Sequence, residues 1–259
     1  MKASYKEKII LITGVGGGIG RSLARYFAPK VKHLVTASRS TDDELHFLDG
    51  LPPNHTHFSI DLTVESNVSD LFTHIADEIG KIDVLINTVG GSLFSHTIEE
   101  FPLNQFNRVI SVNLTSAFLL TKYAVKQMRL NGSRGGNIIH MVSSSAKKFS
   151  NNKAPYGVAK AGLARLIQYA AMENGPYGIK INGISPTYVF TKRHEQSVQT
   201  KMKKSGKTRQ QIVESKINGQ LLKKEMIPDD LIPVTDLLTS TNVITGQIIN
   251  CSLGEVINY

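Results

Sequence analysis

Apolar and polar positions follow two alternating patterns along the chain. Short runs of aliphatic and β-branched residues recur, and segments with apolar residues at helical spacing separate them. The runs are almost continuously apolar, as is typical of parallel strands covered on both faces. They predict seven strands, at residues 8–13, 34–38, 56–61, 84–88, 137–143, 180–185 and 247–252.

The segments between these runs predict helices. Their expected positions are 19–28, 65–79, 104–130, 155–174 and 228–239. In the second of them, Val68, Leu71, Phe72 and Ile75 form a one-sided apolar stripe. Regular strand–helix alternation predicts an α/β fold, namely one Rossmann-type doubly wound parallel sheet with helices on both faces. Because no linker or repeat interrupts the pattern, we expect residues 1–259 to form a single domain.

Composition excludes several other classes of protein. The 259 residues are 41% hydrophobic and 20% charged, with a single cysteine, Cys251. One cysteine rules out an intramolecular disulfide framework and a Cys-rich zinc site, and we expect Cys251 to be a buried apolar side chain. No apolar run has the length of a secretory signal or a membrane span. The expectation is a cytoplasmic protein without a membrane partner.

The net charge of +9 is concentrated in one stretch. Between Thr191 and Lys224 there are ten basic residues and only two acidic ones, a local net charge of +8. Residues 188–225 are polar and only weakly periodic, and they follow the sixth predicted strand. Loops at the carboxyl ends of strands surround the ligand in open α/β sheets. We therefore predict a basic, mobile substrate lid here, with a solubilising charge run as the alternative.

The first predicted strand leads directly into a glycine-rich turn and then a helix. The residues concerned are Thr13, Gly14, Gly16, Gly17, Gly18, Ile19 and Gly20. Glycines let the backbone approach a ligand closely, and free N–H groups at a helix N-terminus bind phosphate. The Gly-Lys-Ser/Thr sequence of a P-loop is missing, which disfavours a kinase or nucleoside triphosphatase.

The second predicted strand ends in Ser38 and Arg39, where an NAD enzyme usually presents a carboxylate. A carboxylate would repel a ribose 2′-phosphate, whereas a guanidinium binds it with two hydrogen bonds. The sequence therefore favours NADP(H), with NAD(H) as the alternative.

Three polar side chains form the candidate catalytic group. Tyr156 and Lys160 are four residues apart at the start of a predicted helix, so they share one face. A nearby cation favours the phenolate and makes tyrosine a usable acid–base group. Thirteen residues before Tyr156, Ser143 ends the fifth predicted strand, and Ser144 or Ser145 could take its place.

Together these motifs resemble the short-chain dehydrogenase/reductase family, in its Tyr-x-x-x-Lys branch, across essentially the whole chain. Further positions are similar to family elements that bind cofactor or assist catalysis: Asp61 with Leu62 after strand three, Asn87 and Gly90 after strand four, Asn113 in a helix, and Pro186 with Thr191 after strand six. Departures are Thr88, Val89, Thr187, Gly17 and the segment 252–254. None of these removes a catalytic group.

The resemblance implies hydride transfer between nicotinamide and a carbonyl carbon. Tyr156 would protonate the alkoxide, Ser143 would hydrogen-bond the same oxygen, and Lys160 would bind the ribose and lower the pKa of Tyr156. Asn113 would hold a water that links Lys160 to solvent. The family also implies a homotetramer or homodimer, formed through helices 104–130 and 155–174.

The predicted lid and the loop after Ser143, with Lys147, Lys148 and Lys153, are both basic and are expected to flank the same cleft. Their charge favours an anionic or carrier-bound carbonyl substrate such as a 3-oxoacyl thioester. A sugar, polyol or secondary-alcohol dehydrogenase of the same family is the alternative. Two hypotheses from different functional classes are a non-catalytic nucleotide sensor and a nucleic-acid-binding protein. The nucleic-acid-binding hypothesis is disfavoured because the basic segment lacks interleaved aromatic residues for base stacking. His55 and His57 alternate on a strand without a third ligand, so no metal is expected.

Overall fold

Seven parallel strands form one sheet in the computed structural model, which describes residues 5–41 and 45–257. The strands are β1 (Ile9–Thr13), β2 (His33–Ser38), β3 (His55–Ser59), β4 (Val84–Asn87), β5 (Gly136–Met141), β6 (Ile179–Pro186) and β7 (Ile248–Cys251). Their order in space is β3-β2-β1-β4-β5-β6-β7, and every neighbouring pair is parallel. After β3 the chain crosses over to β4, on the other side of β1. The carboxyl ends of β1 and β4 therefore diverge into a crevice at this switch point.

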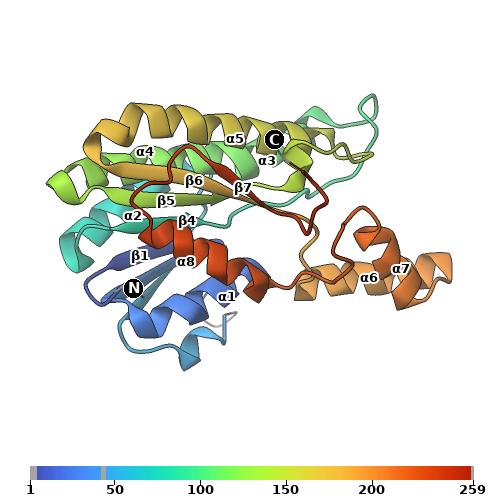
Figure 1. Cartoon of the computed structure of the whole chain (residues 1–259), viewed down its shortest axis with the longest axis horizontal. Coiled ribbons are helices and arrows are strands. Elements are labelled where there is room, and N and C mark those ends of the chain that lie inside the picture. The colour runs from blue at the N-terminus through green and yellow to red at the C-terminus, as the bar shows by residue number, and fades with distance from the viewer. Residues whose placement is uncertain (1–4, 42–44, 258–259) are drawn as a thin grey trace.

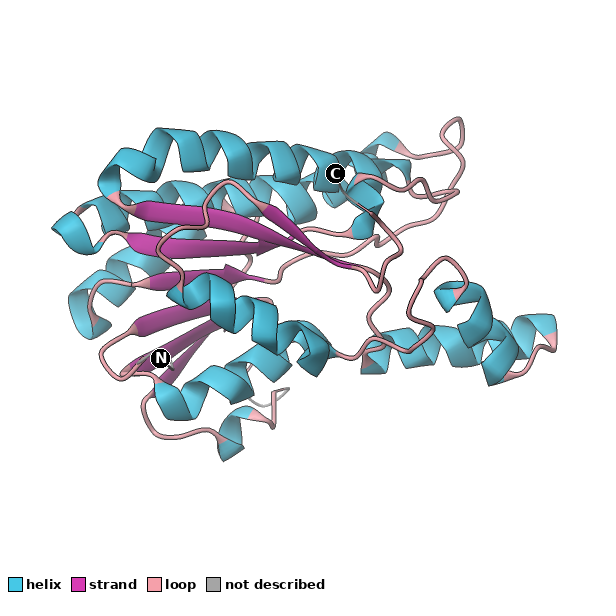
Figure 2. Ribbon diagram, in the orientation of Figure 1, coloured by secondary structure: helices cyan, strands magenta, loops and turns pink. Residues whose placement is uncertain are grey.

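Helices cover both faces of the sheet (Figures 1 and 2). They are α1 (Gly18–Phe27), α2 (Glu65–His74), α3 (Leu103–Ile110), α4 (Ser116–Arg129), α5 (Ala154–Asn174), α6 (Lys192–Ser205), α7 (Arg209–Ile217) and α8 (Ile232–Ser240). One apolar core joins the sheet to α2, α4 and α5, and a second joins it to α1 and α8. The predicted doubly wound sheet is thereby confirmed.

The pleat of β1 explains why the strands are apolar on every residue. Ile9 and Leu11 are buried in the core on the α4–α5 side, whereas Ile10 and Ile12 are buried in the core on the α1–α8 side. Successive side chains of a strand point to opposite faces, so a sheet covered on both faces needs apolar residues at all positions.

Most predicted elements agree with the structure to within about two residues. The predicted helix 104–130 consists of α3, a π-helical turn at Ser111–Thr115 and α4. Cys251 is only partly buried, unlike the buried side chain that we expected, because β7 forms the edge of the sheet. None of the helices in the described chain combines the length and apolar character that a membrane crossing requires. Residues 1–4 of the amino-terminal segment that we searched for a targeting signal lie outside the described part.

The basic segment 188–225 contains two helices, α6 and α7, which its weak periodicity did not predict. The side chain of Thr191 accepts a hydrogen bond at the start of α6, and Thr208 and Gln211 form a reciprocal capping box at the start of α7. These caps satisfy the free N–H groups of both helices. Few apolar residues of the pair are buried, so the helical stripe is narrow and hard to detect in sequence. The pair extends beyond the main body at the end where α1 begins (Figure 1).

Candidate active site

A cleft of about 580 Å³ lies at the carboxyl ends of the strands around the switch point. Its volume is in the range of small-molecule and cofactor sites. Most of the predicted cofactor-binding residues line it: Gly14, Gly16, Gly17, Gly18, Ile19, Gly20, Ser38, Arg39, Asp61, Leu62, Gly90 and Thr191. The structure thus brings together residues from four separate loops and from the start of α6. The other predicted cofactor-binding residues, Thr13, Asn87, Tyr156, Lys160 and Pro186, are not among the residues that line this cleft.

The glycine turn packs too tightly for side chains. Gly14 has a φ of +83°, and a Cβ there would lie 2.7 Å from the Thr88 hydroxyl oxygen. A Cβ on Gly20 would lie 2.7 Å from the carbonyl oxygen of Gly14. Helix α1 begins after Gly17, which offers no capping side chain to its first N–H groups. The turn therefore presents backbone donors at a positive helix terminus, which suits a phosphate group.

The β2 end of the cleft carries the expected cationic side chain. Arg39 is exposed and lines the cleft between Ser38 and Ser40. Asp61, across from it, is held by other partners: its Oδ1 accepts from the Thr63 N–H at 2.9 Å and the Thr63 hydroxyl at 2.6 Å, and its Oδ2 lies 3.7 Å from Arg108. Burial raises the pKa of Asp61, but these hydrogen bonds and the nearby guanidinium groups outweigh it and lower that pKa.

Ser143 and Tyr156 meet beyond the end of β5. Ser143 is buried and extended, and its side-chain oxygen accepts from the Ser145 N–H at 3.1 Å. It lies close enough to the Tyr156 phenol to lower the pKa of that group. Burial raises the pKa of Tyr156 more than Ser143 and the charge of Arg193 lower it. The direction is opposite to the one expected from a neighbouring Lys160. Lys160 Nζ lies 5.9 Å from the centre of the Tyr156 ring, and burial of the phenol has the largest effect on the pKa of Tyr156.

Lys160 is almost completely buried, and its ammonium donates to the Met141 carbonyl oxygen at 2.7 Å. Burial in this low-dielectric position lowers the pKa of Lys160 to about 7. A Cβ at Gly90 would lie 3.0 Å from Lys160 Nζ, so the glycine leaves room for the ammonium beside the cleft.

Asn113 lies in the π-helical turn between α3 and α4 and is fully buried. Its amide donates to the carbonyl oxygens of Val109 and Gly91, each at 2.9 Å, and accepts from the Gly91 N–H at 2.9 Å. Both amide N–H bonds and one of two acceptor sites are therefore used by the protein. The side chain therefore anchors the loop after β4, and one acceptor site is left for the water that we expected it to hold.

Thr13 and Asn87 are buried parts of a hydrogen-bonded chain rather than cleft residues. The Thr13 hydroxyl donates to Asn87 Oδ1 at 2.8 Å, and Asn87 Nδ2 lies 3.1 Å from His140 Nδ1. His140 Nε2 lies 3.0 Å from the hydroxyl oxygen of Thr121, on α4. The chain connects the start of the glycine turn to the sheet and to α4. Sequence reasoning missed His140, although a histidine inside an otherwise apolar strand is a visible signal.

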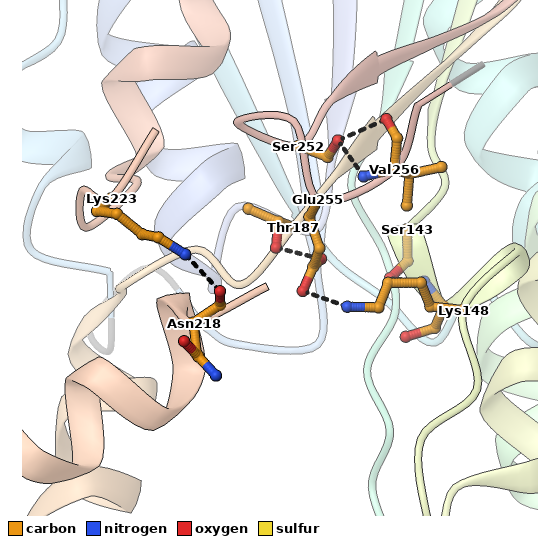
Figure 3. A network of polar contacts seen from close by, with 9 residues as sticks. Ser143, Lys148, Thr187, Asn218, Lys223, Ser252, Glu255 and Val256 are labelled. Carbon is orange, nitrogen blue, oxygen red and sulfur yellow. Dashed lines mark hydrogen bonds and ion pairs between the residues drawn. The ribbon is translucent and has the colours of Figure 1, made fainter. Parts of the chain in front are cut away.

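A second network lies beside Ser143, at the C-terminal end of the chain (Figure 3). The Glu255 carboxylate accepts from Lys148 Nζ at 2.8 Å and from the Thr187 hydroxyl at 2.5 Å. It joins the loops that follow β5 and β6 to the segment that follows β7. Because these partners are about 70 and 110 residues away in sequence, no local pattern indicates the network.

Thr191 links the glycine turn to the basic segment. A Cβ on Gly18 would lie 2.7 Å from Thr191 Cγ2, and the Thr191 hydroxyl lies 2.9 Å from His194 Nδ1. Arg193, in the next turn, lines the cleft and carries a charge that acts on Tyr156. Sequence reasoning counted Arg193 only within the basic segment. Within the described residues, no group of three His, Cys, Asp or Glu side chains could hold a metal ion.

A glycine turn that suits a phosphate group, together with a Ser–Tyr–Lys group on a doubly wound sheet, is the arrangement expected of a dinucleotide-dependent oxidoreductase. Comparison with known proteins supports this class of enzyme. The family model for short chain dehydrogenases matches residues 8–202. D-β-hydroxybutyrate dehydrogenase of Rhizobium meliloti is 32% identical over 223 residues, which are 84% of this chain and 85% of that protein. A mitochondrial borneol dehydrogenase of Lavandula x intermedia is 35% identical over 185 residues, 71% of this chain and 70% of that one.

Among solved structures, ElxO with NADP bound superposes with a TM-score of 0.85 and 26% identity, covering 96% of this chain and 98% of that one. The chain belongs to the short-chain dehydrogenase/reductase family and is an NAD(P)-dependent oxidoreductase.

Proposed function

We propose that the protein transfers hydride between NADP(H) and a carbonyl or secondary-alcohol carbon, with Tyr156 as the proton donor in the reducing direction. The observation that carries this proposal is that buried Ser143 lies close enough to Tyr156 to influence its phenol, one helical turn from buried Lys160. At neutral pH the Tyr156 phenol is protonated, which is the form that a proton donor requires.

The cleft residues fit NADP(H). Backbone N–H groups of the glycine turn would bind the pyrophosphate, and Arg39 would bind the 2′-phosphate with the hydroxyls of Ser38 and Ser40 beside it. The cofactor would supply the hydride, and the protein would orient the cofactor and provide the electrostatic environment. Asp61 and Leu62 would contact the adenine end and Thr191 the nicotinamide end, and all three residues line the cleft.

The remaining polar residues divide into those that handle the proton and those that hold the site. Ser143 would hydrogen-bond the substrate oxygen and Tyr156 would protonate it. Lys160 would bind the ribose hydroxyls, and a pKa of about 7 lets it exchange a proton near neutral pH. We assign Asn113 a positioning role, because its amide holds Gly91 and leaves a single acceptor site for a water.

For the substrate we propose a ketone whose position is fixed by the α6–α7 pair, acting as a lid. A 3-oxoacyl thioester is one candidate, supported by the basic character of the lid. A secondary-alcohol dehydrogenase acting on a small or polycyclic alcohol is the second candidate. Its support is that the relatives are dehydrogenases named for hydroxybutyrate and for borneol.

The test is oxidation of NADPH and NADH at 340 nm with acetoacetyl thioesters, small ketones and polyols, comparing the wild type with Tyr156→Phe. We expect turnover with NADPH that falls at least about 100-fold in the variant, because general acid catalysis contributes roughly 10²–10⁴-fold. Retained turnover in Tyr156→Phe would refute the assignment of the proton donor. If neither cofactor binds, the assignment of the cleft is wrong.

We also infer that the protein assembles through α4 and α5, as the family resemblance implied. Large apolar side chains are exposed on these helices: Phe118 on α4, and Val158, Tyr169 and Met172 on α5. An apolar surface of this kind is typical of an interface between subunits. Light scattering after size-exclusion chromatography should give a dimer or tetramer, and Met172→Asp should shift it toward monomer. The cytoplasmic location stays a prediction.

A further inference from the structure

Four cationic side chains from three different parts of the chain lie near one another, and one of them, Arg193, lines the cleft. Lys153 immediately precedes α5, Arg193 and Lys201 belong to α6, and Lys216 belongs to α7. Lys153 and Lys216 are half-buried, although the other two are exposed. In the part of the chain that the structure describes, none of the four has a carboxylate partner.

Lys201 lies close enough to Lys216 to lower the pKa of its ammonium group, and each ammonium group offers only donors. Lys153 is close enough to add to the repulsion on Lys216. Lys216 also lies over the ring of Tyr188, with Nζ 5.2 Å from its centre. Burial, followed by the two neighbouring lysines, lowers the pKa of Lys216 to about 8. Like charges this close are unfavourable until a negative group lies between them.

Two other cations of the basic segment, Arg209 and Lys224, are paired with carboxylates. The Arg209 guanidinium binds Glu195 and Glu225 at distances of 2.7–3.1 Å, and Lys224 binds Asp230 at 2.8 Å. The paired residues brace α6 against α7 and the chain that follows.

Arg193 and Lys153 are the two of these cations that lie near Tyr156, the reacting group. Arg193 lines the cleft, its guanidinium lies 3.3 Å from where a Cβ of Gly91 would be, and its charge acts on Tyr156. Lys153 is three residues before Tyr156, and Lys153, Arg193 and Lys216 all act on His194. His194 is not a further cation here, because burial and these charges lower its pKa to about 4.

We propose that Lys153, Arg193, Lys201 and Lys216 form a binding site for an oxyanion of the substrate, a carboxylate or a phosphate on the molecule whose carbonyl Tyr156 protonates. Guanidinium and ammonium groups provide short, charge-assisted hydrogen bonds to both kinds of anion. The inference rests on the proposed reductase function, and it narrows the substrate from any ketone to an anionic one.

The kinetic test compares each anionic substrate with a neutral counterpart. The pairs are acetoacetate with methyl acetoacetate, and dihydroxyacetone phosphate with dihydroxyacetone, so that carboxylate and phosphate recognition are distinguished. Lys201→Met and Lys216→Met keep the length of the side chain and remove its charge. The matched control is Lys203→Met, a substitution at an exposed lysine of α6.

For the anionic member of one pair, we expect Lys201→Met and Lys216→Met each to raise KM at least about 10-fold, the effect of losing one charge-assisted hydrogen bond. kcat/KM for the neutral member should change less than about twofold, and Lys216→Arg should restore most of the affinity. Lys203→Met should match the wild type. Equal use of anionic and neutral ketones by the wild type, or equal loss on both in the variants, would overturn the proposal.

A binding measurement separates this inference from the proposed reaction. Inorganic phosphate and acetate are titrated calorimetrically into the wild type and the three Met variants in the absence of cofactor. Binding that weakens in Lys201→Met and Lys216→Met, but not in Lys203→Met, supports the anion site even where no ketone is turned over. In that case the proposed reaction fails and the anion site stands. Phosphate and acetate that both fail to bind the wild type, or that bind all four proteins equally, contradict the anion site, whatever the kinetics show.

Discussion

His140 gives the sharpest quantitative prediction, because its hydrogen bonds determine where its proton lies. The oxygen of the Asn87 amide is identified by two donors, the Thr13 hydroxyl and the Val89 N–H at 3.0 Å. Asn87 Nδ2 therefore donates to His140 Nδ1. The Thr121 hydroxyl donates to the Ala117 carbonyl oxygen at 2.7 Å, so it accepts from His140 Nε2–H. The neutral Nε2–H form satisfies every group, and a second proton would face the Asn87 amide.

Burial, followed by the charge of Lys160, lowers the pKa of His140 to about 3. An unfolded histidine has a pKa of about 6.5, so below that pH His140 is protonated in the unfolded state but stays neutral in the folded state. The stabilising contribution is present above pH 6.5 and is lost as the pH falls toward 3. Lowering the pH from 7 to 5 should therefore reduce the free energy of unfolding by about 2 kcal/mol through this residue alone.

The assay is denaturant unfolding followed by far-ultraviolet circular dichroism, at pH 7 and pH 5. His140→Asn keeps an acceptor and a donor but cannot be protonated, and His46→Asn, at an exposed histidine, is the control. The wild type and His46→Asn should lose about 2 kcal/mol more than His140→Asn between the two pH values. The loss of packing in His140→Asn is present at both pH values and cancels. A difference below about 0.5 kcal/mol would refute our assignment of a buried neutral histidine.

Three further predictions concern the cleft, the lid and the C-terminal network. Arg39→Ser should raise KM for NADPH about 10–100-fold and leave KM for NADH nearly unchanged, since a charge-assisted hydrogen bond is worth about 1.5–3 kcal/mol; equal changes for both cofactors would contradict it. Arg209→Met removes exposed ion pairs worth at most about 1 kcal/mol each, so Tm should fall less than about 8 °C. Proteolysis within residues 191–225 should nevertheless become several-fold faster, and an unchanged cleavage rate would exclude bracing by Arg209. Burial raises the pKa of Glu255, but the contacts with Lys148 and Thr187 outweigh burial and lower that pKa overall. The carboxylate therefore stabilises the fold above the pKa that Glu255 has in the unfolded chain, and this stabilisation is lost in acid. The stability gap between wild type and Glu255→Gln should therefore shrink from pH 7 to pH 3; a constant gap would show that the carboxylate charge plays no part.

The glycine turn and the Ser–Tyr–Lys group illustrate what local sequence could predict. The turn needs no side chains, so glycines at fixed spacing after an apolar strand are a direct record of its geometry. Tyr156 and Lys160 are one helical turn apart, so their shared face follows from helix geometry alone. The π-helical turn that carries Asn113 and the caps that make α6 and α7 helical depend on single hydrogen bonds, and periodicity does not register them.

The alternating apolar runs, the phosphate-binding turn and the missing carboxylate after β2 were decided by sequence alone, because each depends on neighbours within one element. Contacts between distant elements were decided only by the tertiary structure. They include the burial that raises the pKa of Tyr156, the chain through His140, and the approach of Lys201 to Lys216. Burial and charge depend on which segments pack together, and a pattern read one residue after another carries no distance between segments. For that reason the family could be inferred from the sequence, whereas the anion site required the fold.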